Sequence, residues 1–216
     1  FATTCMSCHA DIRRDDPKRK ITAEMTSIEL LGTDPLTAQN AVNAEADTGI
    51  LKGRFVHVVG GVTRFGERSS VLDMLRHVVE GLLAQQPDKI VKSSITNVGW
   101  FTTERHGQYE RDAKNPVRSL LTYKARPLNG VWATAPFLHN GSVPTLYDLL
   151  LPADKRPATF KVGSNQYDPE KAGFVSDQGS FLFDTSLRGN SNKGHEYGTS
   201  ISEADRLALL EYLKSL

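Results

Sequence analysis

Near the start of the sequence stands Cys5-Met6-Ser7-Cys8-His9, which contains both cysteines of the chain. Two cysteines separated by two residues and followed directly by histidine form the attachment signature of c-type haem. One turn of helix presents both thiols to one edge of a porphyrin, and the adjacent imidazole then lies under the iron as its proximal ligand. We therefore expect one covalently bound haem c, held by Cys5, Cys8 and His9.

A zinc site, a redox dithiol or a disulfide would account for less of this motif. A structural zinc site needs four ligands, and the sequence has neither a second cysteine pair nor two histidines at the usual spacing. A redox dithiol of the thioredoxin type follows a strand, but only a handful of residues precede Cys5. A disulfide across this short loop would leave His9 without a role.

The composition describes a globular chain with balanced charge. Of its 216 residues 39% are apolar, which suffices for a buried core, and 26 basic residues stand against 25 acidic ones. The net charge of +1 excludes a strongly basic nucleic-acid binder, and no apolar run is long enough to span a membrane. Because bacteria attach haem c after export, we expect a periplasmic or secreted protein whose signal peptide precedes Phe1.

Helical signals are strongest in the middle and at the end of the chain. Residues 69–86 carry a broad apolar stripe at helical spacing. The final helix is expected to begin after Ser202, because Asp205 stands three residues further on, in a pair that resembles a capping box. A shorter helix is expected over residues 35–43, with Asp34 as its N-cap and Pro35 as its first residue, and another over residues 144–150.

The remaining segments carry loop signals. Residues 11–20 form a mixed charge run, 92–141 and 152–200 are polar and rich in turn residues, and 55–59 is either a short strand or a buried loop. A haem-bearing helix at the start, a final helix able to cross it and loops around the cofactor correspond to a class I cytochrome c. We therefore expect a mainly α, class I cytochrome c-like fold with long loop insertions, forming a single c-type cytochrome domain over residues 1–216.

Function depends on the group that occupies the sixth coordination site of the iron. A second strong ligand makes an electron carrier, whereas an open site admits dioxygen or peroxide. His195 is the best candidate, because it lies in the glycine-rich loop 189–198 directly before the final helix, where class I cytochromes carry their distal ligand. His139 ranks second; it precedes the turn Asn140-Gly141 and is otherwise expected to hydrogen-bond that turn and so fix a cofactor-facing loop. His57, His77 and His106 are expected not to bind the iron. Among the methionines, Met6 lies on the proximal side and cannot reach the other face, Met74 is expected to pack in the core, and Met25 is an ordinary candidate.

Several segments resemble bacterial di-haem cytochrome c peroxidases and MauG-type enzymes. Residues 133–146, Ala-Thr-Ala-Pro-Phe-Leu-His-Asn-Gly-Ser-Val-Pro-Thr-Leu, are similar to the family motif T-x-P-[YF]-x-H-[DN]-G-S-x-x-T-L. The wider context resembles the rubber oxygenase (RoxA-like) branch of that superfamily. Four further segments carry this resemblance: Ile28–Pro35, Tyr123–Trp132, Gly189–Asn192 and Gly194-His195.

The resemblance implies a particular kind of haem site. Such enzymes carry an accessible active-site haem and, in the C-terminal half, a six-coordinate electron-transfer haem, and this chain resembles that C-terminal half. Its haem would accordingly be bis-histidine, with His9 proximal and His195 distal. The family's calcium ion lies between the halves and is bound partly by backbone carbonyls, which correspond here to those of Thr134 and Pro136. Arg126 would be suited to pair with a haem propionate.

The sequence departs from this family because it contains one haem-attachment motif rather than two. The expected function is one-electron transfer by a mono-haem domain, with another redox centre or haem protein as partner, such as a separate N-terminal haem half. The alternative is a haem-dependent peroxidase or dioxygenase that acts on H2O2 or O2 at this haem. A third hypothesis is a haem-stabilised binding module whose redox activity is incidental.

Overall fold

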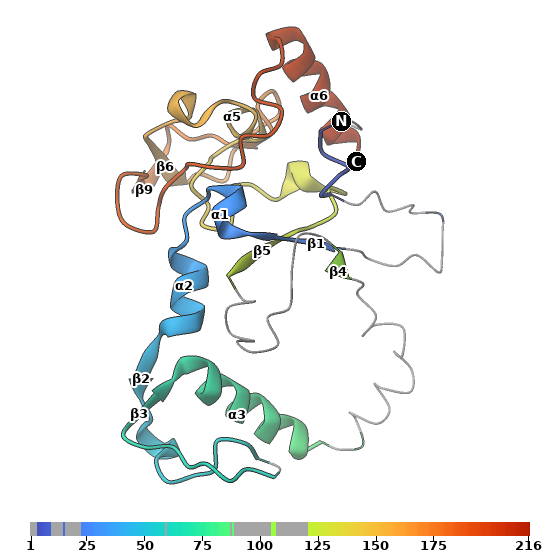
Figure 1. Ribbon diagram of the computed structural model, residues 1–216. Coiled ribbons are helices and arrows are strands. Elements are labelled where there is room, and N and C mark those ends of the chain that lie inside the picture. The colour runs from blue at the N-terminus through green and yellow to red at the C-terminus, as the bar shows by residue number, and fades with distance from the viewer. Residues whose placement is uncertain are drawn as a thin grey trace. The chain divides into compact units, whose positions relative to one another are not determined.

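The fold is taken from a computed structural model, which describes residues 4–9, 15, 23–58, 60–86, 88, 105–106 and 121–216. In these residues the helices, drawn as coiled ribbons in Figure 1, are α1 (Ile28–Leu31), α2 (Leu36–Asn43), α3 (Val71–Ala84), α5 (Leu146–Leu149) and α6 (Glu203–Ser215). The strands are β1 (Ala23–Ser27), β2 (Glu45–Asp47), β3 (Arg68–Ser70), β4 (Arg105–His106), β5 (Thr122–Ala125), β6 (Thr159–Gly163), β7 (Tyr167–Asp168), β8 (Gly173–Phe174) and β9 (Gly179–Asp184). Among the described residues, no helix has the length and apolar character that a membrane span requires.

The expectation of a mainly α, class I cytochrome c-like fold with long loop insertions is wrong. About 32% of the described residues are helical and about 20% lie in strands, arranged as five short helices and several small sheets. The clearest difference falls within residues 152–200, expected as loop, where β6 and β9 form an antiparallel ribbon. In that ribbon Phe160 lies opposite Phe183 with ring centres 5.0 Å apart, a cross-strand aromatic pair of the kind that stabilises sheets.

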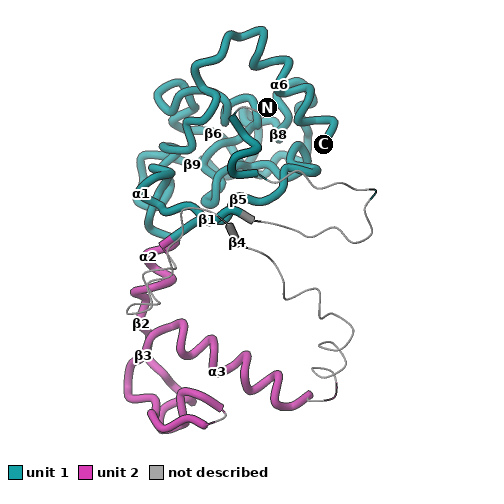
Figure 2. The backbone as a smooth tube through the Cα atoms, turned by 45° about the vertical axis from the view of Figure 1, so that its right-hand side comes forward, with its two compact units in different colours: residues 1–37, 104–111, 122–216 teal, residues 38–103, 112–121 magenta. Residues whose placement is uncertain are grey.

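The chain divides into two compact units, coloured separately in Figure 2. Unit 1 comprises residues 1–37, 104–111 and 122–216, and unit 2 comprises residues 38–103 and 112–121. Cys5, Cys8, His9 and His195, the expected haem-binding residues, all belong to unit 1. The expectation of a single c-type cytochrome domain over the whole chain stays a prediction.

The core of unit 1 lies around α5 and α6. Its buried apolar side chains are Phe137, Val143, Leu146, Leu150, Ala172, Leu210 and Leu213. Both helices form where the sequence predicts them, because a side-chain oxygen caps each N-terminus. Thr145 accepts a hydrogen bond from the Asp148 amide, and Ser202 accepts one from the Asp205 amide.

The sheet of unit 1 leads directly to the segment that supports the site. β1 pairs antiparallel with β5, so that Thr26 lies opposite Tyr123, and β4 pairs with β1 in parallel. α1 follows β1 and ends at Gly32, which takes the left-handed conformation with φ 66°. Asp34 then accepts a hydrogen bond from the Leu36 amide at 2.9 Å and caps α2, as predicted.

Unit 2 contains the β2–β3 ribbon and the helix α3 (Figure 1). Ser70 caps α3, so the helix predicted for residues 69–86 is confirmed with shorter ends. In its described part, the segment 55–59 is not a strand, because Phe55 forms one isolated bridge with Arg64. The apolar stripe of α3 is largely exposed rather than enclosed by described residues; its exposed members are Val71, Leu75, Val78, Val79, Leu82 and Leu83.

Two segments expected as loops lie mostly outside the described residues. They are 11–20, apart from Asp15, and the first part of 92–141, where only 105–106 are described before residue 121.

Candidate haem site

The attachment motif forms one turn near the N-terminus. The His9 amide donates a hydrogen bond to the Cys5 carbonyl at 2.8 Å, and the Cys8 amide donates to the same oxygen at 3.2 Å. The first of these is the bond between residues i and i−4 that defines an α-helical turn. Cys5 and Cys8 are free, half-buried thiols, and burial raises the pKa of Cys5. One turn therefore carries both thiols, as covalent attachment of a haem requires.

The imidazole of His9 is oriented by a segment far away in the sequence. Its Nδ1 lies 2.6 Å from the backbone carbonyl oxygen of Arg126, directly after β5. Because a carbonyl oxygen only accepts, Nδ1 carries the proton and donates it, and Nε2 keeps a free lone pair. This tautomer is the one that binds a metal through Nε2. The sequence pointed to the guanidinium of Arg126, whereas the structure brings its carbonyl to the site.

His195 lies opposite His9 although 186 positions separate them in the sequence. Their ring centres are 6.2 Å apart, and the ring planes meet at 66°. An imidazole nitrogen binds a divalent metal at about 2 Å, so two rings on opposite sides of one metal have centres roughly 6 Å apart. The spacing of the two rings therefore fits one haem iron between them.

The surroundings of His195 keep its ring neutral. Its Nδ1 is buried and has no hydrogen-bond partner among the described residues. Burial, and after it the electrostatic influence of the neighbouring His9 and Arg156, lowers the pKa of His195 to about 4. A histidine binds a metal only through a deprotonated nitrogen, so this environment suits an iron ligand.

The backbone beside His195 packs too closely for any residue except glycine. Gly194 has φ 78°, and a Cβ there would lie 2.4 Å from backbone atoms of both Gly32 and Thr33. The His195 amide in turn donates to the carbonyl of Leu31 at 2.9 Å, at the end of α1. The predicted glycine-rich loop therefore packs directly against the C-terminal end of α1.

The motif at residues 133–146 holds the same loop from another side. Asn140 donates to the carbonyls of Gly189 and Ser191 at 3.1 and 3.0 Å, and Ser142 donates to the carbonyl of Ser191 at 2.9 Å. The loop-fixing role expected of His139 thus belongs to its neighbours. His139 itself stacks on Tyr123 with ring centres 4.0 Å apart, and burial lowers its pKa.

Arg156, which the sequence did not mark as a site residue, is buried behind the loop. Its guanidinium donates to the carbonyl oxygens of three loop residues, Asn192, Gly194 and His195. No local motif marks this residue, because its partners in the loop lie 36 to 39 positions away. The sequence offered one indication: no acidic residue stands three or four positions from Arg156, where it could form an ion pair along a helix.

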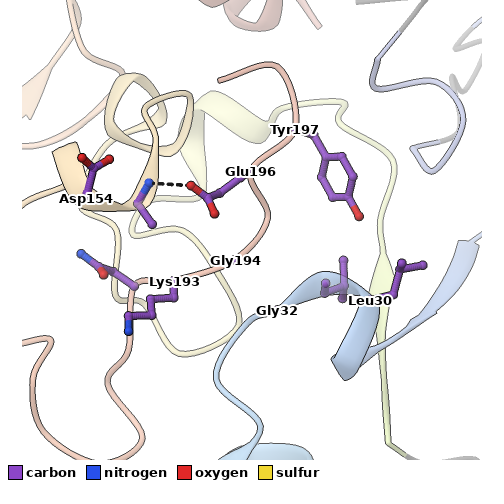
Figure 3. A pocket seen from close by; sticks show the side chains of 10 residues that line it. Leu30, Gly32, Asp154, Lys193, Gly194, Glu196 and Tyr197 are labelled. Carbon is purple, nitrogen blue, oxygen red and sulfur yellow. Dashed lines mark hydrogen bonds between the residues drawn. The ribbon is translucent and has the colours of Figure 1, made fainter. Parts of the chain in front are cut away.

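A cavity of about 700 Å³ lies beside the loop (Figure 3). Glu196 accepts a hydrogen bond from the Ala153 amide at 2.9 Å, shown as the dashed line in Figure 3. Tyr197 lines the cavity and also packs edge-on against His195, with ring centres 5.3 Å apart. The cysteines and His9 do not line this cavity, so it borders the haem site rather than forming it.

Calcium is expected at the backbone carbonyls of Thr134 and Pro136, which follow the short turn Val131–Ala133. The hydroxyl of Thr134 donates to the carbonyl of Val131 at 2.8 Å. Among the described residues, no group of three or more His, Cys, Asp or Glu side chains is placed to hold a metal ion. Because the expected ligands are backbone carbonyls, calcium binding stays a prediction.

The weaker axial candidates lie in other surroundings. In unit 2, His57 Nδ1 lies 3.5 Å from a carboxylate oxygen of Glu80, and His77 Nδ1 lies 3.3 Å from the carbonyl of Val56. The side chain of His106 lies outside the described residues. The methionines are distributed over three places, Met6 in the attachment turn, Met25 in β1 and Met74 in α3.

One segment of the chain is similar to a known protein family, and the match indicates first a class of protein and then a branch of that class. Residues 122–161 match a cytochrome c-like family, the class of haem c-binding, electron-transfer domains. The matching family is described as RoxA-like, cytochrome c-like, so the resemblance expected from the sequence is confirmed for these residues. The matched stretch includes β5, the whole of the motif at 133–146 and part of β6.

Two proteins of Sinorhizobium fredii (strain NBRC 101917 / NGR234) are similar to parts of the chain. The uncharacterized protein y4iJ is 49% identical over 114 residues, which cover 48% of this chain and 19% of y4iJ. The uncharacterized protein y4iM is 60% identical over 55 residues, which cover 26% of this chain and 12% of y4iM. The matched region is therefore a small part of each relative.

Proposed function

We propose that this chain is a mono-haem c-type cytochrome domain that transfers one electron, with His9 and His195 as the two axial ligands of its iron. The observation that carries the proposal is the 6.2 Å spacing between the ring centres of these two histidines. The cytochrome c-like match supports the class of protein, and the ring spacing supports the ligand pair. When bound, the haem supplies an iron that alternates between the ferric and ferrous states.

The chain's own residues would set the properties of that iron. The carbonyl of Arg126 fixes His9 with Nε2 free, and burial keeps His195 neutral. His9 and His195 would hold the iron from its two sides, which would exclude small ligands and favour a low-spin electron carrier over a peroxidase or dioxygenase. The hydrogen bonds around the loop limit how far His195 can move, which keeps the change in structure between redox states small.

The partner follows from the same proposal. A one-electron carrier needs a neighbouring redox centre, and we place that centre in another haem protein or in an N-terminal haem half. This chain spans 19% of y4iJ and 12% of y4iM, which leaves ample length in such relatives for another domain. The net charge of +1 favours docking through a local patch rather than steering by the whole molecule.

The proposal also includes a location and a second metal. We place the protein in the bacterial periplasm or outside the cell, where haem c is attached. We also propose that the backbone carbonyls of Thr134 and Pro136 bind calcium.

Carbon monoxide binding to the ferrous protein tests the assignment. The wild type should be low-spin and bind CO slowly or not at all, whereas His195→Ala should bind CO rapidly. His139→Ala is the matched control, because it removes another histidine of the same unit and should leave CO binding unchanged. Rapid CO binding by the wild type would support an open-site enzyme instead.

A further inference from the structure

Arg156 is a buried cation whose hydrogen bonds to the described residues all go to backbone oxygens. The residue is 5% exposed. Nε donates to the carbonyl of Leu151 at 3.0 Å, and Nη2 donates to that of Leu149 at 3.3 Å. These two bonds attach the guanidinium to the segment at the end of α5.

The other side of the same guanidinium reaches the loop that carries His195. Nη1 donates to the carbonyls of Asn192 and Gly194 at 2.6 and 2.8 Å, and Nη2 donates to that of His195 at 3.4 Å. A guanidinium has five N–H donors in a rigid planar arrangement, and here five carbonyls receive them. One side chain therefore ties three carbonyls of the loop to the core segment beside α5.

Lysine would not reproduce this arrangement. Its ammonium has three donors on one atom at the end of a flexible stem, whereas the guanidinium spreads its donors over a plane. An Arg156→Lys variant would keep the positive charge but leave loop carbonyls without partners. Loss of hydrogen bonds can thus be separated from loss of charge.

We propose that Arg156 is the positioning residue of the haem site: by binding the carbonyls of Asn192, Gly194 and His195 it holds the loop so that the His195 imidazole faces His9. This inference rests on the proposed function, because it gives Arg156 its role through His195. Arg156 itself does not touch the iron. Its effect is on the fraction of time that His195 occupies the axial position.

Arg206 provides a matched control in the same unit. It is 8% exposed and also donates to backbone carbonyls, among them that of Leu150 at 3.2 Å. Its remaining partners are Glu203, Thr199 and Ile201, none of them in the segment 192–195. Arg206→Lys should therefore weaken the fold as a buried arginine substitution does, without releasing His195.

The experiment compares full-length holoproteins of the wild type, Arg156→Lys, Arg206→Lys and His195→Ala. Stopped-flow measurement gives the CO association rate of each ferrous protein, and thermal unfolding gives its stability. We expect Arg156→Lys to bind CO at least about tenfold faster than wild type, since several charged hydrogen bonds hold the loop. Arg206→Lys should keep the wild-type rate even if its melting temperature falls. Added imidazole should restore the low-spin ferric spectrum of Arg156→Lys.

Each outcome decides one question. If Arg156→Lys keeps the wild-type CO rate, or if Arg206→Lys accelerates CO binding equally, the positioning role is overturned. If Arg156→Lys yields no haem protein while Arg206→Lys does, Arg156 serves folding in general and the proposal also fails. If wild type and His195→Ala bind CO at the same rate, the failure belongs to the proposed function and not to Arg156.

Discussion

At the scale of single residues, the site depends on a backbone conformation that non-glycine residues seldom adopt. His195 has φ 52°, and its surroundings must hold it there. The sequence predicted His195 from the glycines around it and from its position before the final helix. It did not predict Asn140, Ser142 or Arg156 as supports, because their bonds to the loop join segments 36 to 51 positions apart.

Substitution of Gly194 should be costly. Gly194→Ala adds a Cβ to a left-handed backbone, at about 1–2 kcal/mol, and forces it against Gly32 and Thr33, at about 1–3 kcal/mol more. Gly130→Ala is the control, because Gly130 has φ 74° but open space around its Cβ position. Denaturant unfolding of both variants measures the difference. Equal losses of stability would show that the close approach at Gly194 is absent.

The pH dependence of stability should contain a contribution from His139. Burial lowers its pKa in the folded protein below the ordinary 6.5, so the unfolded chain binds a proton more readily. Stability should therefore fall as the pH drops from 7 to 5. His139→Phe keeps an aromatic ring to stack on Tyr123 but cannot titrate, and should lose less stability over this range. Identical losses in unfolding free energy for the two proteins would contradict the assignment.

At the scale of helices and strands, the residues that cap helices predicted the secondary structure better than the composition of each segment did. Ser202 with Asp205, and Asp34 before α2, predicted helix starts correctly, because capping depends on neighbouring residues alone. The ribbon β6–β9 was missed, because Gly163 and Gly179 interrupt its pattern at a register shift and its partner strand lies beyond a long connection. Strand pairing of this kind is a long-range property that a short window of sequence does not contain.

The N-cap of α5 should contribute more to the free energy of unfolding than the short length of this helix suggests. Thr145 is 2% exposed, accepts from the Asp148 amide and donates to the Asp148 carboxylate at 2.6 Å. Thr145→Ala should cost about 1–2 kcal/mol of unfolding free energy, toward the upper end of cap substitutions because the site is buried. Ser202→Ala removes an exposed cap as the comparison. A cost for Thr145→Ala no larger than that of Ser202→Ala would be the contrary result.

At the scale of the whole molecule, the haem site and the apolar core of unit 1 are built from different residues. The core contains Phe137, Val143 and Leu210, whereas the site is formed by the turn at 4–9 and the loop at 189–195. The attachment motif and the chain order led to Cys5, Cys8, His9 and His195 as the expected haem site, and this assignment stays a prediction. The overall fold class was predicted wrongly, because the helix signals on which it was based carry no information about the strand pairing within residues 152–200.

Removal of the haem should therefore destabilise the turn at 4–9 and the loop at 189–195 more than the helices α5 and α6. A Cys5→Ser, Cys8→Ser variant cannot attach haem covalently and should melt at a lower temperature, because a group that binds only the folded state stabilises it. Hydrogen exchange should increase in the turn and the loop while α5 and α6 remain protected. Loss of protection across both helices would show that the core depends on the haem.

The central claim is that the imidazoles of His9 and His195 bind the same iron. Pulsed electron paramagnetic resonance of the ferric protein with isotopically labelled histidine counts the imidazole nitrogens bound to the metal. We predict two for the wild type and one for His195→Ala, with the low-spin signal of the wild type lost in the variant. A single bound imidazole in the wild type would contradict the claim.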